Sequence, residues 1–519
     1  MPLAVIFSRG LSGLDAPQVQ VEVHLANGLP SFTIVGLADT GVRESKDRVR
    51  AAIIQSGYEF PNRRITVNLA PADLPKCSGR FDLAIALGIL AASAQIPLSQ
   101  LAQYEFAGEL SLSGELRPFV GCLAIGMAMR QEKSPRTFIV PHQNCSIIRI
   151  IPDLQVLGAS CLAQVCDFLC NRIQLKLAQN EFVNDVSQLV NRSTHDMANV
   201  HGHLIAKRAL EIAAAGFHSI LLAGPPGSGK SMLANCLPQL LPELNLDEAL
   251  EVAALHSLKN NFKQSAFTPT ALSRVRPFQS PHHTITAAAL VGGGSNPKPG
   301  EVTLAHHGVL FLDELPQFAR QTLETLREPL QNQQVTITRA HFACRFPSNF
   351  MLVTAMNLCP CGYFGHLEKS CICTPIQKQR YQNKISGPLL DRIDIKMTVA
   401  PVPPDAFFKT QWSSQSGEAS TLIAQRIAKA WTVQKKRQEK LNHALDPQEI
   451  KRVITIHPND QQELKRVWEV LKLSGRGMHR LLKIARTIAD LEGHTRTQVL
   501  RSHLLEASAL SKPISGMTN

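Results

Sequence analysis

Short runs of alternating apolar and polar residues dominate the first third of the chain. They are VQVEVHLANG (residues 19–28), SFTIVGL (31–37), RITVNLAP (64–71) and TFIVP (137–141). Alternation with a period of two predicts half-buried β-strands, and the stretch between them at residues 39–57 has the pattern of a helix. The pattern therefore predicts an α/β domain over residues 1–175.

The longest apolar run is LAIALGILAASAQIPL, residues 83–98. It is shorter than the roughly 18 to 20 unbroken residues that a membrane-spanning helix needs, and it follows Asp82, so it predicts a buried helix. The first residues lack the basic region and the cleavage-type site of a signal peptide. We therefore expect a cytoplasmic protein that does not bind a membrane.

The pattern changes twice further along the chain. A polar stretch without apolar periodicity predicts a linker over residues 176–203. Residues 218–237 then read as an apolar strand, a Gly/Pro-rich loop and a helix, which open a second α/β domain over residues 204–400. From about residue 421 apolar residues recur with a period of 3.6, so residues 401–519 are predicted to form a small helical domain.

Charge is concentrated in the last part of the chain. The net charge is +13, and residues 375–519 hold 24 Lys and Arg against 13 Asp and Glu. A basic surface attracts polyanions through counterion release, so nucleic acid is the first partner to consider. An anionic membrane surface or a merely solvated helical face are the alternatives.

Residues 224–231, GPPGSGKS, satisfy the motif G-x-x-x-x-G-K-[ST] between a predicted strand and a predicted helix. In such a loop the backbone N–H groups surround phosphate oxygens, the lysine reaches the β and γ phosphates, and the last hydroxyl ligates Mg²⁺. The candidates for binding ATP are Gly224, Pro225, Pro226, Gly227, Ser228, Gly229, Lys230 and Ser231.

Two more apolar strands end in polar residues. GVLFLDEL (308–315) delivers Asp313 and Glu314 to one sheet edge, where one carboxylate can hold Mg²⁺ and the other can polarise water. FMLVTAMN (350–357) ends at Asn357, which can orient the attacking water or sense the γ-phosphate. Alone, each would be a plain strand end, but the preceding phosphate-binding loop favours the catalytic interpretation.

Four cysteines cluster in LCPCGYFGHLEKSCICTP, residues 358–375. Disulfides are rare in a reducing compartment, and the spacing is not the C-x-x-C of thioredoxin-like redox sites. Four thiolates suit a closed, structural Zn²⁺ site, for which the candidate ligands are Cys359, Cys361, Cys371 and Cys373. His366, within the loop, is a possible substitute ligand.

These motifs, with LLDRIDI (389–395) and SGRGMHRLLKIARTIADL (474–491), resemble the magnesium-chelatase-like branch of AAA+ ATPases. Residues 276–294 and 299–318 are similar to the ComM/YifB family of competence-associated DNA helicases, and the similarity spans nearly the whole chain. The resemblance implies an AAA+ P-loop α/β core with a C-terminal helical lid, and ATP and Mg²⁺ as cofactors.

The same resemblance implies roles for two arginines. Arg392 is the expected arginine finger for a neighbouring subunit, and Arg476 is the expected sensor-two arginine, with Arg480 as the alternative. Arginine suits both roles because its cationic fork stabilises charge on transferring phosphoryl oxygens. The VHGH at residues 200–203 departs from the family's Lys-Gly-Gln run, so adenine contacts there stay open.

By resemblance, the expected assembly is a homo-hexamer with helicase and branch-migration activity in homologous recombination during natural transformation. The implied partners are single-stranded and branched DNA, with a recombinase filament as a further candidate. VTITRA (335–340) has the pattern of a hairpin that carries Arg339 toward a pore, and His282, His283 and Lys298 are weaker pore candidates. The alternative is a magnesium-chelatase-like motor subunit that remodels a protein partner.

Residues 68–90 and 107–130 resemble the proteolytic domain of Lon proteases, which has a ribosomal S5-type fold and a Ser-Lys dyad. Motif alignment places the nucleophile at or near Asp82 and the lysine at Ala124, and neither side chain can perform that chemistry. We therefore expect a Lon-protease-like domain without a catalytic dyad. Ser78 and Lys76 are the nearest substitutes.

Overall fold

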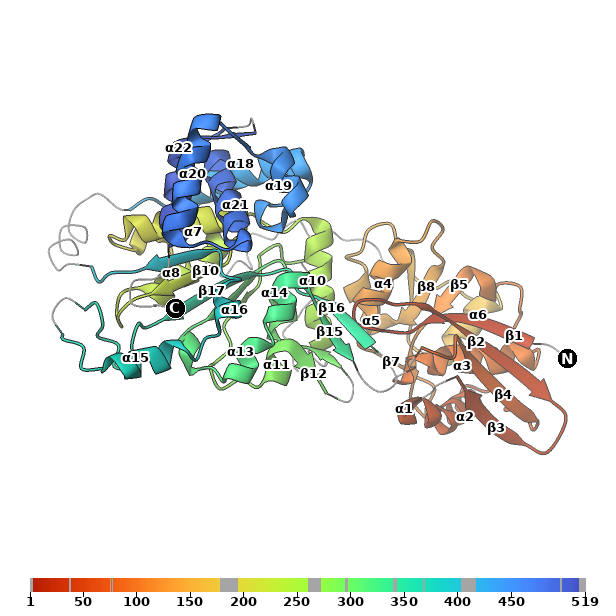
Figure 1. The fold of residues 1–519 in the computed structure, drawn as a ribbon. Coiled ribbons are helices and arrows are strands. Elements are labelled where there is room, and N and C mark those ends of the chain that lie inside the picture. The colour runs from red at the N-terminus through yellow and green to blue at the C-terminus, as the bar shows by residue number, and fades with distance from the viewer. Residues whose placement is uncertain are drawn as a thin grey trace.

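The computed structural model describes residues 3–36, 39–74, 76, 78–177, 195–259, 272–294, 297–338, 343–366, 369–402, 417–494 and 497–512. The N-terminal part lies at one end, a second sheet with its helices lies in the middle, and the C-terminal helices cover one side of that sheet (Figure 1). None of the helices in these ranges is both long and apolar enough to cross a bilayer.

The N-terminal part is built on a seven-stranded mixed sheet with the strand order β3-β4-β2-β1-β5-β8-β9. The strands are β1 (Leu3–Arg9), β2 (Gln18–Ala26), β3 (Ser31–Val35), β4 (Arg64–Ala70), β5 (Tyr104–Phe106), β8 (Thr137–Pro141) and β9 (Val156–Ala159). A short pair, β6 (Glu109–Leu110) and β7 (Leu116–Arg117), stands beside it. In β2 every second side chain is buried, which confirms the period-two prediction.

The helices of this part are α1 (Thr40–Arg43), α2 (Ser45–Gln55), α3 (Asp82–Ala92), α4 (Cys122–Arg130), α5 (His142–Ile148) and α6 (Leu162–Leu169). All of α3 is buried, which confirms the buried helix predicted from the apolar run as far as Ala92. Gly88 lets α3 approach the sheet, because a Cβ there would lie 2.5 Å from a methyl carbon of Val23.

The central sheet is fully parallel, with the strand order β11-β14-β17-β10-β18. Its strands are β10 (Ile220–Ala223), β11 (Phe278–Gln279), β14 (Val309–Leu312), β17 (Met351–Met356) and β18 (Ile395–Thr398). The runs ILLA, VLFL and MLVTAM are buried throughout, as expected for strands covered on both faces. This sheet confirms the predicted α/β architecture around the phosphate-binding loop.

The helices around this sheet are α7 (Leu204–Gly216), α8 (Lys230–Asn235), α9 (Leu237–Leu240), α10 (Leu246–Lys259), α11 (Ala287–Val291), α12 (Glu301–Leu304), α13 (Arg320–Glu324), α14 (Arg327–Asn332), α15 (Pro375–Gln382) and α16 (Gly387–Leu390). A short pair, β12 (Gly292–Gly293) and β13 (Lys298–Pro299), and a hairpin, β15 (Gln334–Thr338) and β16 (Ala343–Pro347), extend from it. The hairpin runs toward the N-terminal part (Figure 1). Its turn, including the pore candidate Arg339, lies outside the described residues.

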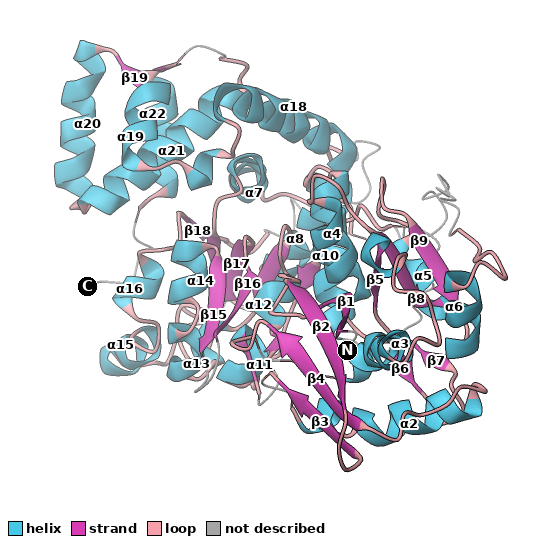
Figure 2. Cartoon of the chain, turned by 90° about the vertical axis from the view of Figure 1, so that its right-hand side faces the viewer, coloured by secondary structure: helices cyan, strands magenta, loops and turns pink. Residues whose placement is uncertain are grey.

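The C-terminal helices are α18 (Ser420–Gln438), α19 (Pro447–Val453), α20 (Pro458–Leu471), α21 (Gly475–Leu491) and α22 (Arg501–Leu510), with the pair β19 (Thr455–Ile456) and β20 (Gln498–Val499). They share one hydrophobic core with α7 and the central sheet. In Figure 2, α18 lies across α7, and the Trp431 indole N–H donates to the Ala214 carbonyl at 3.0 Å.

Most of the predicted linker, residues 176–203, lies outside the described residues. Its last part is different, because Met197 and Val200 are buried in the core that α7 shares with the C-terminal helices. Asp196 Oδ1 also accepts hydrogen bonds from the backbone N–H groups of Ala198 and Ser420. This end of the segment therefore belongs to the core. Its two apolar side chains are isolated within a polar stretch, so the sequence pattern did not predict their burial.

Helix α10 joins the N-terminal part to the central sheet. Leu250, Ala253 and Ala254 of α10 pack into the core formed by α4 and α5. On its other side, Glu248 accepts a hydrogen bond from Arg276 at 3.1 Å. One helix is therefore a structural member of both parts.

Candidate nucleotide-binding site

The phosphate-binding loop lies between the end of β10 and the start of α8. Gly229 has φ of 76°, a left-handed conformation that favours glycine, just before the helix begins at Lys230. Lys230 Nζ donates to the carbonyls of Gly224 at 3.0 Å and Pro225 at 2.8 Å. Burial lowers the pKa of Lys230, while the charge of Asp313 raises it.

The loop after β14 brings two carboxylates to the same edge of the sheet. The Ser231 hydroxyl donates to Asp313 Oδ2 at 2.6 Å, and the backbone N–H of Glu314 donates to Asp313 Oδ1 at 2.8 Å. A hydroxyl and a carboxylate in contact are the oxygen ligands that Mg²⁺ uses beside a nucleotide. The Glu314 side chain is more than half exposed, which leaves its carboxylate accessible to water.

Asn357 completes the edge from the strand between the other two. Its Oδ1 accepts a hydrogen bond from Lys230 Nζ at 3.3 Å, and β17 pairs with both β10 and β14. The carboxyl ends of parallel strands meet at one edge, which is where open α/β sheets bind ligands. The structure thus brings together residues 224–231, Asp313, Glu314 and Asn357, an arrangement that can hold a nucleotide phosphate, a divalent cation and an activated water.

The sequence did not predict the contact of His283 with Glu314. His283 Nδ1 lies 3.8 Å from Glu314 Oε2, and the His283 ring packs edge-on against Phe318. From the sequence alone, His283 is only a weak candidate for lining a pore. No motif signals the contact, because His283 follows β11 and Glu314 follows β14, and these strands become neighbours only in the folded sheet.

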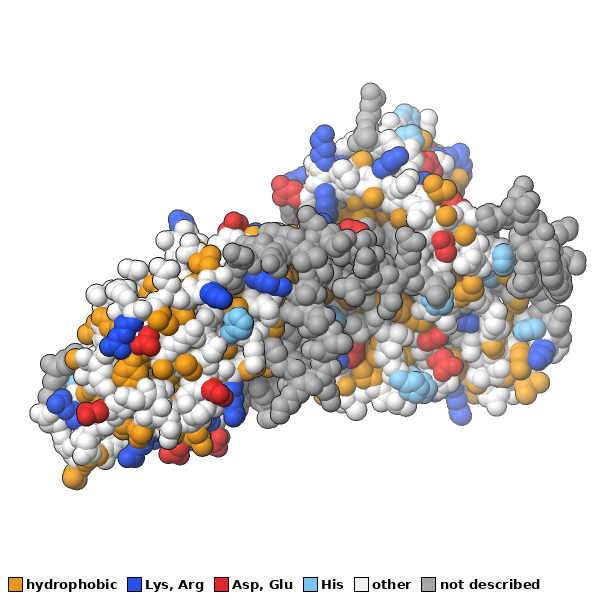
Figure 3. All heavy atoms as spheres, turned by 180° about the vertical axis from the view of Figure 1, so that it is seen from behind, with side chains coloured by type: hydrophobic (Ala, Val, Ile, Leu, Met, Phe, Trp, Pro, Cys, Tyr) orange, Lys and Arg blue, Asp and Glu red, His pale blue; other side chains and the backbone are white. Residues whose placement is uncertain are grey.

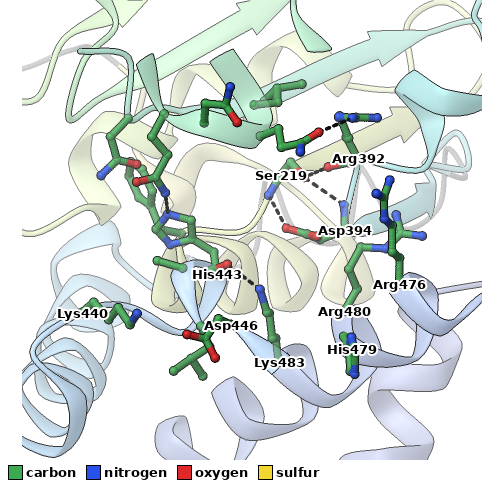
Figure 4. Close-up of a pocket in the computed structure, with 18 of the residues that line it drawn as sticks. Ser219, Arg392, Asp394, Lys440, His443, Asp446, Arg476, His479, Arg480 and Lys483 are labelled. Atoms are coloured by element: carbon green, nitrogen blue, oxygen red, sulfur yellow. Dashed lines mark hydrogen bonds between the residues drawn. The ribbon is translucent and has the colours of Figure 1, made fainter. Parts of the chain in front are cut away.

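Arg392 and Arg476 lie in a different place. A pocket of about 660 Å³ opens between the central sheet and the C-terminal helices, and Arg392, Arg476 and Arg480 line it (Figure 4). Arg392 donates to the Pro388 carbonyl at 2.8 Å and to Gln331 Oε1 at 2.7 Å. Burial, together with the charges of Arg327 and Arg476, lowers the pKa of Arg392, so this pocket gathers positive charge.

This pocket is at the edge of the sheet opposite the phosphate-binding loop. The Ser219 hydroxyl, just before β10, donates to the Arg392 carbonyl at 2.9 Å, whereas Gly224 follows the other end of β10. At about 3.3 Å per residue, the strand separates these ends by roughly 13 Å or more. The structure therefore brings the two arginines together, and it does not bring them to Lys230 of the same subunit.

The four clustered cysteines come within reach of one ion. Cys359 Sγ lies 3.4 Å from Cys361 Sγ and 3.6 Å from Cys371 Sγ, and Cys361 Sγ lies 3.7 Å from Cys371 Sγ. All four sulfur atoms, including that of Cys373, lie within 4.8 Å of one another and none forms a disulfide. A tetrahedron with Zn–S bonds of about 2.3 Å has an edge of about 3.8 Å, so the donor set fits zinc.

Two histidine–glutamate clusters in the described part of the chain fit a metal less well. His306 Nδ1 accepts the Asn349 backbone N–H at 2.9 Å, so its Nε2 carries the proton and donates to Glu251 at 3.3 Å. His503 is arranged in the same way between the Leu500 N–H and Glu492. Because Nδ1 already accepts an N–H, a metal ion on either Nε2 would require an imidazolate ring with no proton on either nitrogen. We therefore interpret these clusters as hydrogen-bond networks.

Ser78 and Lys76, both among the described residues of the N-terminal part, are not hydrogen-bonded to each other. Asp82 is buried, and it accepts hydrogen bonds from Arg48 at 2.8 Å and from Ser45. Burial raises the pKa of Asp82, while the hydrogen bonds from Arg48 and Ser45 lower it. Asp82 is therefore the buried partner of an ion pair with Arg48, whose side chain is partly exposed.

The substitutes for the dyad are also engaged elsewhere. Lys76 donates to the Pro71 carbonyl, and Ser78 accepts from Arg80 at 2.9 Å. Ala124 is buried within α4. These contacts leave Ser78 and Lys76 with separate partners.

The parallel sheet with a phosphate-binding loop at its carboxyl edge has the architecture of a P-loop α/β protein, and matches to known families place the chain in the magnesium-chelatase class. Residues 196–407 match the family described as "Magnesium chelatase, subunit ChlI", residues 21–144 match "Subunit ChlI of Mg-chelatase", and residues 417–510 match "Magnesium chelatase, subunit ChlI C-terminal". This membership supports an ATPase.

Full-length relatives define the family more narrowly. The chain is 43% identical over 513 residues to "Competence protein ComM" of Haemophilus influenzae, covering 98% of this chain and 97% of that protein. It is 45% identical over 508 residues to "Uncharacterized protein YifB" of Escherichia coli, covering 98% and 96%. The chain belongs to the ComM/YifB family of magnesium-chelatase-like proteins.

Proposed function

We propose that this chain is an ATP-driven DNA motor that works as a homo-hexameric ring and migrates DNA branches during recombination of incoming DNA. The observation that carries the ring is the separation of the two sites. The phosphate-binding loop is at one edge of the central sheet and Arg392 is at the other. A subunit of this shape can supply its arginines only to a nucleotide held by a neighbour.

In this proposal Lys230 binds the β and γ phosphates, and Ser231 and Asp313 hold Mg²⁺. Glu314 polarises the attacking water, Asn357 positions it, and Arg392 and Arg476 of the neighbouring subunit stabilise charge on the transferring phosphoryl group. Residues 204–400 would form the ATPase core and residues 401–519 its helical lid. Residues 1–175 would serve as a non-proteolytic, Lon-protease-like scaffold.

DNA is supported by the relative named for competence and by the β15–β16 hairpin, which projects from the ATPase core. The described face in Figure 3 mixes basic and acidic side chains, so that face favours no continuous DNA path. We therefore assign DNA contact to the hairpin and to the ring's pore. Single-stranded and branched DNA are the proposed ligands, and a recombinase filament is the proposed protein partner.

We also propose that Cys359, Cys361, Cys371 and Cys373 hold one structural zinc ion. Four sulfur atoms that can surround one centre support this assignment. Zinc supplies no chemistry in a closed tetrathiolate site and acts as a crosslink within the loop. Metal analysis of wild type and of Cys371→Ser tests it, and a stoichiometric metal content unchanged by the substitution contradicts it.

ATP-dependent dissolution of a mobile four-way or three-strand DNA junction tests the motor, with Lys230→Ala and Glu314→Gln as controls. We expect junction movement by wild type and none by either variant. Hydrolysis without DNA stimulation or strand movement would contradict the DNA assignment. In that case the family match favours the second candidate, a magnesium-chelatase-like motor that remodels a protein partner.

A further inference from the structure

We propose that the four-cysteine loop is part of the nucleotide site, because it braces the phosphate-binding loop through Gly362 and makes nucleotide affinity depend on the bound metal. The inference rests on the zinc site and the nucleotide site proposed above, and it does not depend on DNA.

The two loops touch at one glycine. Gly362 has φ of 85°, and a Cβ on it would lie 2.8 Å from Pro226 Cγ and 3.0 Å from Pro226 Cδ. The same point lies 3.9 Å from the side-chain nitrogen of Asn357. The Gly362 backbone therefore packs against the phosphate-binding loop so closely that no side chain fits between them.

Local hydrogen bonds connect this glycine to the cysteines. The Gly362 N–H donates to the Cys359 carbonyl at 3.1 Å, and the Phe364 N–H donates to Cys359 Sγ at 3.3 Å. Gln382 of α15 donates to the Leu358 carbonyl at 3.1 Å, which holds the start of the loop. A turn with these contacts is compact and can transmit the position of the sulfur atoms to Gly362.

The cysteines flank the residues that the proposed nucleotide site needs. Cys359 is fully buried and follows Asn357 by two positions, and Cys361 immediately precedes Gly362. A metal held also by Cys371 and Cys373 would tie these two positions to the far end of the loop. Gly362 is thus a positioning residue that acts through Pro226, and the metal acts through Gly362.

A matched pair of alanine substitutions isolates the contact. Gly365 lies in the same loop with φ of 81°, and a Cβ on it would meet nothing within 4 Å. Gly362→Ala and Gly365→Ala therefore impose similar backbone strain, and only the first overlaps Pro226. We expect Gly362→Ala to raise the Kd for Mg·ATPγS by about tenfold relative to Gly365→Ala, with about one zinc per chain in both.

A compensating substitution and metal removal complete the test. Alanine lacks Cγ and Cδ, so Pro226→Ala removes the atoms that the new Cβ would overlap. In a Pro226→Ala background, Gly362→Ala should therefore raise the Kd much less than it does in wild type. Chelation of zinc from full-length wild type should raise the same Kd, and added Zn²⁺ should restore it.

Equal Kd values for the two glycine variants, absence of zinc from wild type, or a Kd unchanged by chelation would each overturn the proposal. If Gly362→Ala itself loses zinc, the chelation experiment decides. The Kd values are measured by calorimetry without DNA, and the zinc content is measured by metal analysis. A failed junction assay therefore leaves the brace standing, whereas a wild type that binds no nucleotide overturns both.

Discussion

The two edges of the central sheet differ in the side chains that they bring together. At the carboxyl edge, Lys230, Ser231 and Asp313 are hydrogen-bonded to groups of the same chain. At the amino edge, Arg392 and Arg476 line a pocket between the sheet and the C-terminal helices. In the proposed ring, folding one chain would prepare the phosphate-binding half of the site, while the arginine half would act on a nucleotide held by a neighbouring subunit.

The largest effect on this comparison is expected from removing Arg392, the proposed arginine finger. We expect Arg392→Ala to lower the turnover number for ATP by about 10³-fold, because an arginine finger stabilises charge that appears only in the transition state. The Kd for nucleotide should stay near the wild-type value, since residues 224–231 are untouched. Steady-state hydrolysis and calorimetry measure the two quantities separately.

Mixing variants sharpens the same result. Arg392→Ala subunits keep the phosphate-binding loop and Lys230→Ala subunits keep Arg392, so rings of the proposed kind that contain both variants would have some complete sites. Activity of the mixture above that of either variant is expected. A mixture as inactive as its components would mean that the arginine does not act across subunits.

A smaller effect is expected from Asp394, which follows Arg392 by two positions and accepts a hydrogen bond from the Ser219 backbone N–H at 3.2 Å. Burial raises the pKa of Asp394, but nearby His218 and the charges of Arg480 and Lys483 lower it to about 2. Because the folded pKa lies below the unfolded value of about 3.9, the ionised carboxylate stabilises the fold above pH 4, and this contribution disappears as the pH falls toward 2. Asp394→Asn should therefore lower the unfolding free energy by about 2 kcal/mol at pH 7, and by less at pH 3.

Urea unfolding at both pH values measures this difference. Asp391→Asn is the matched control, because the Asp391 side chain is 62% exposed and lies 3.7 Å from Arg480. An exposed pair of this kind contributes at most about 1 kcal/mol. Equal losses of unfolding free energy for the two variants would show that Asp394 stabilises the fold no more than the exposed Asp391 does.

The smallest effect concerns Gln331, which accepts a hydrogen bond from Arg392 at 2.7 Å. Gln331→Leu keeps the approximate size but removes the acceptor, so we expect a change in turnover of about three- to tenfold without loss of nucleotide affinity. Gln334→Leu, on the neighbouring strand β15, is the control. Identical turnover numbers for the two variants would show that the hydrogen bond from Arg392 to Gln331 does not affect catalysis.

Much of the phosphate-binding edge could be predicted from motifs, because each motif combines a local backbone conformation with the side chains that contact a ligand there. The glycine-rich loop, the Asp313–Glu314 pair and Asn357 each follow an apolar strand, and parallel strands place their ends together. The cysteine spacing likewise predicted a cluster, which the structure shows. The roles assigned to these residues stay predictions.

Other features of the site depend on pairs that are distant in sequence. The contact of Gly362 with Pro226 and that of His283 with Glu314 each join separate loops, and no motif indicates that these loops meet. The position of Arg392 depends on strand order, because β18 pairs beside β10 although most of the core separates them in sequence. Local periodicity contains no information about such neighbours.

Helix α10 limits how the molecule can be divided. Leu250, Ala253 and Ala254 lie under the N-terminal part, so a chain that began after residue 177 would expose them to water. The same truncation would remove the partner of Asp247, which accepts a hydrogen bond from Arg130 at 2.9 Å. A chain shortened in this way would carry a new apolar surface, so its insolubility would not test the role of the N-terminal part in the proposed DNA motor.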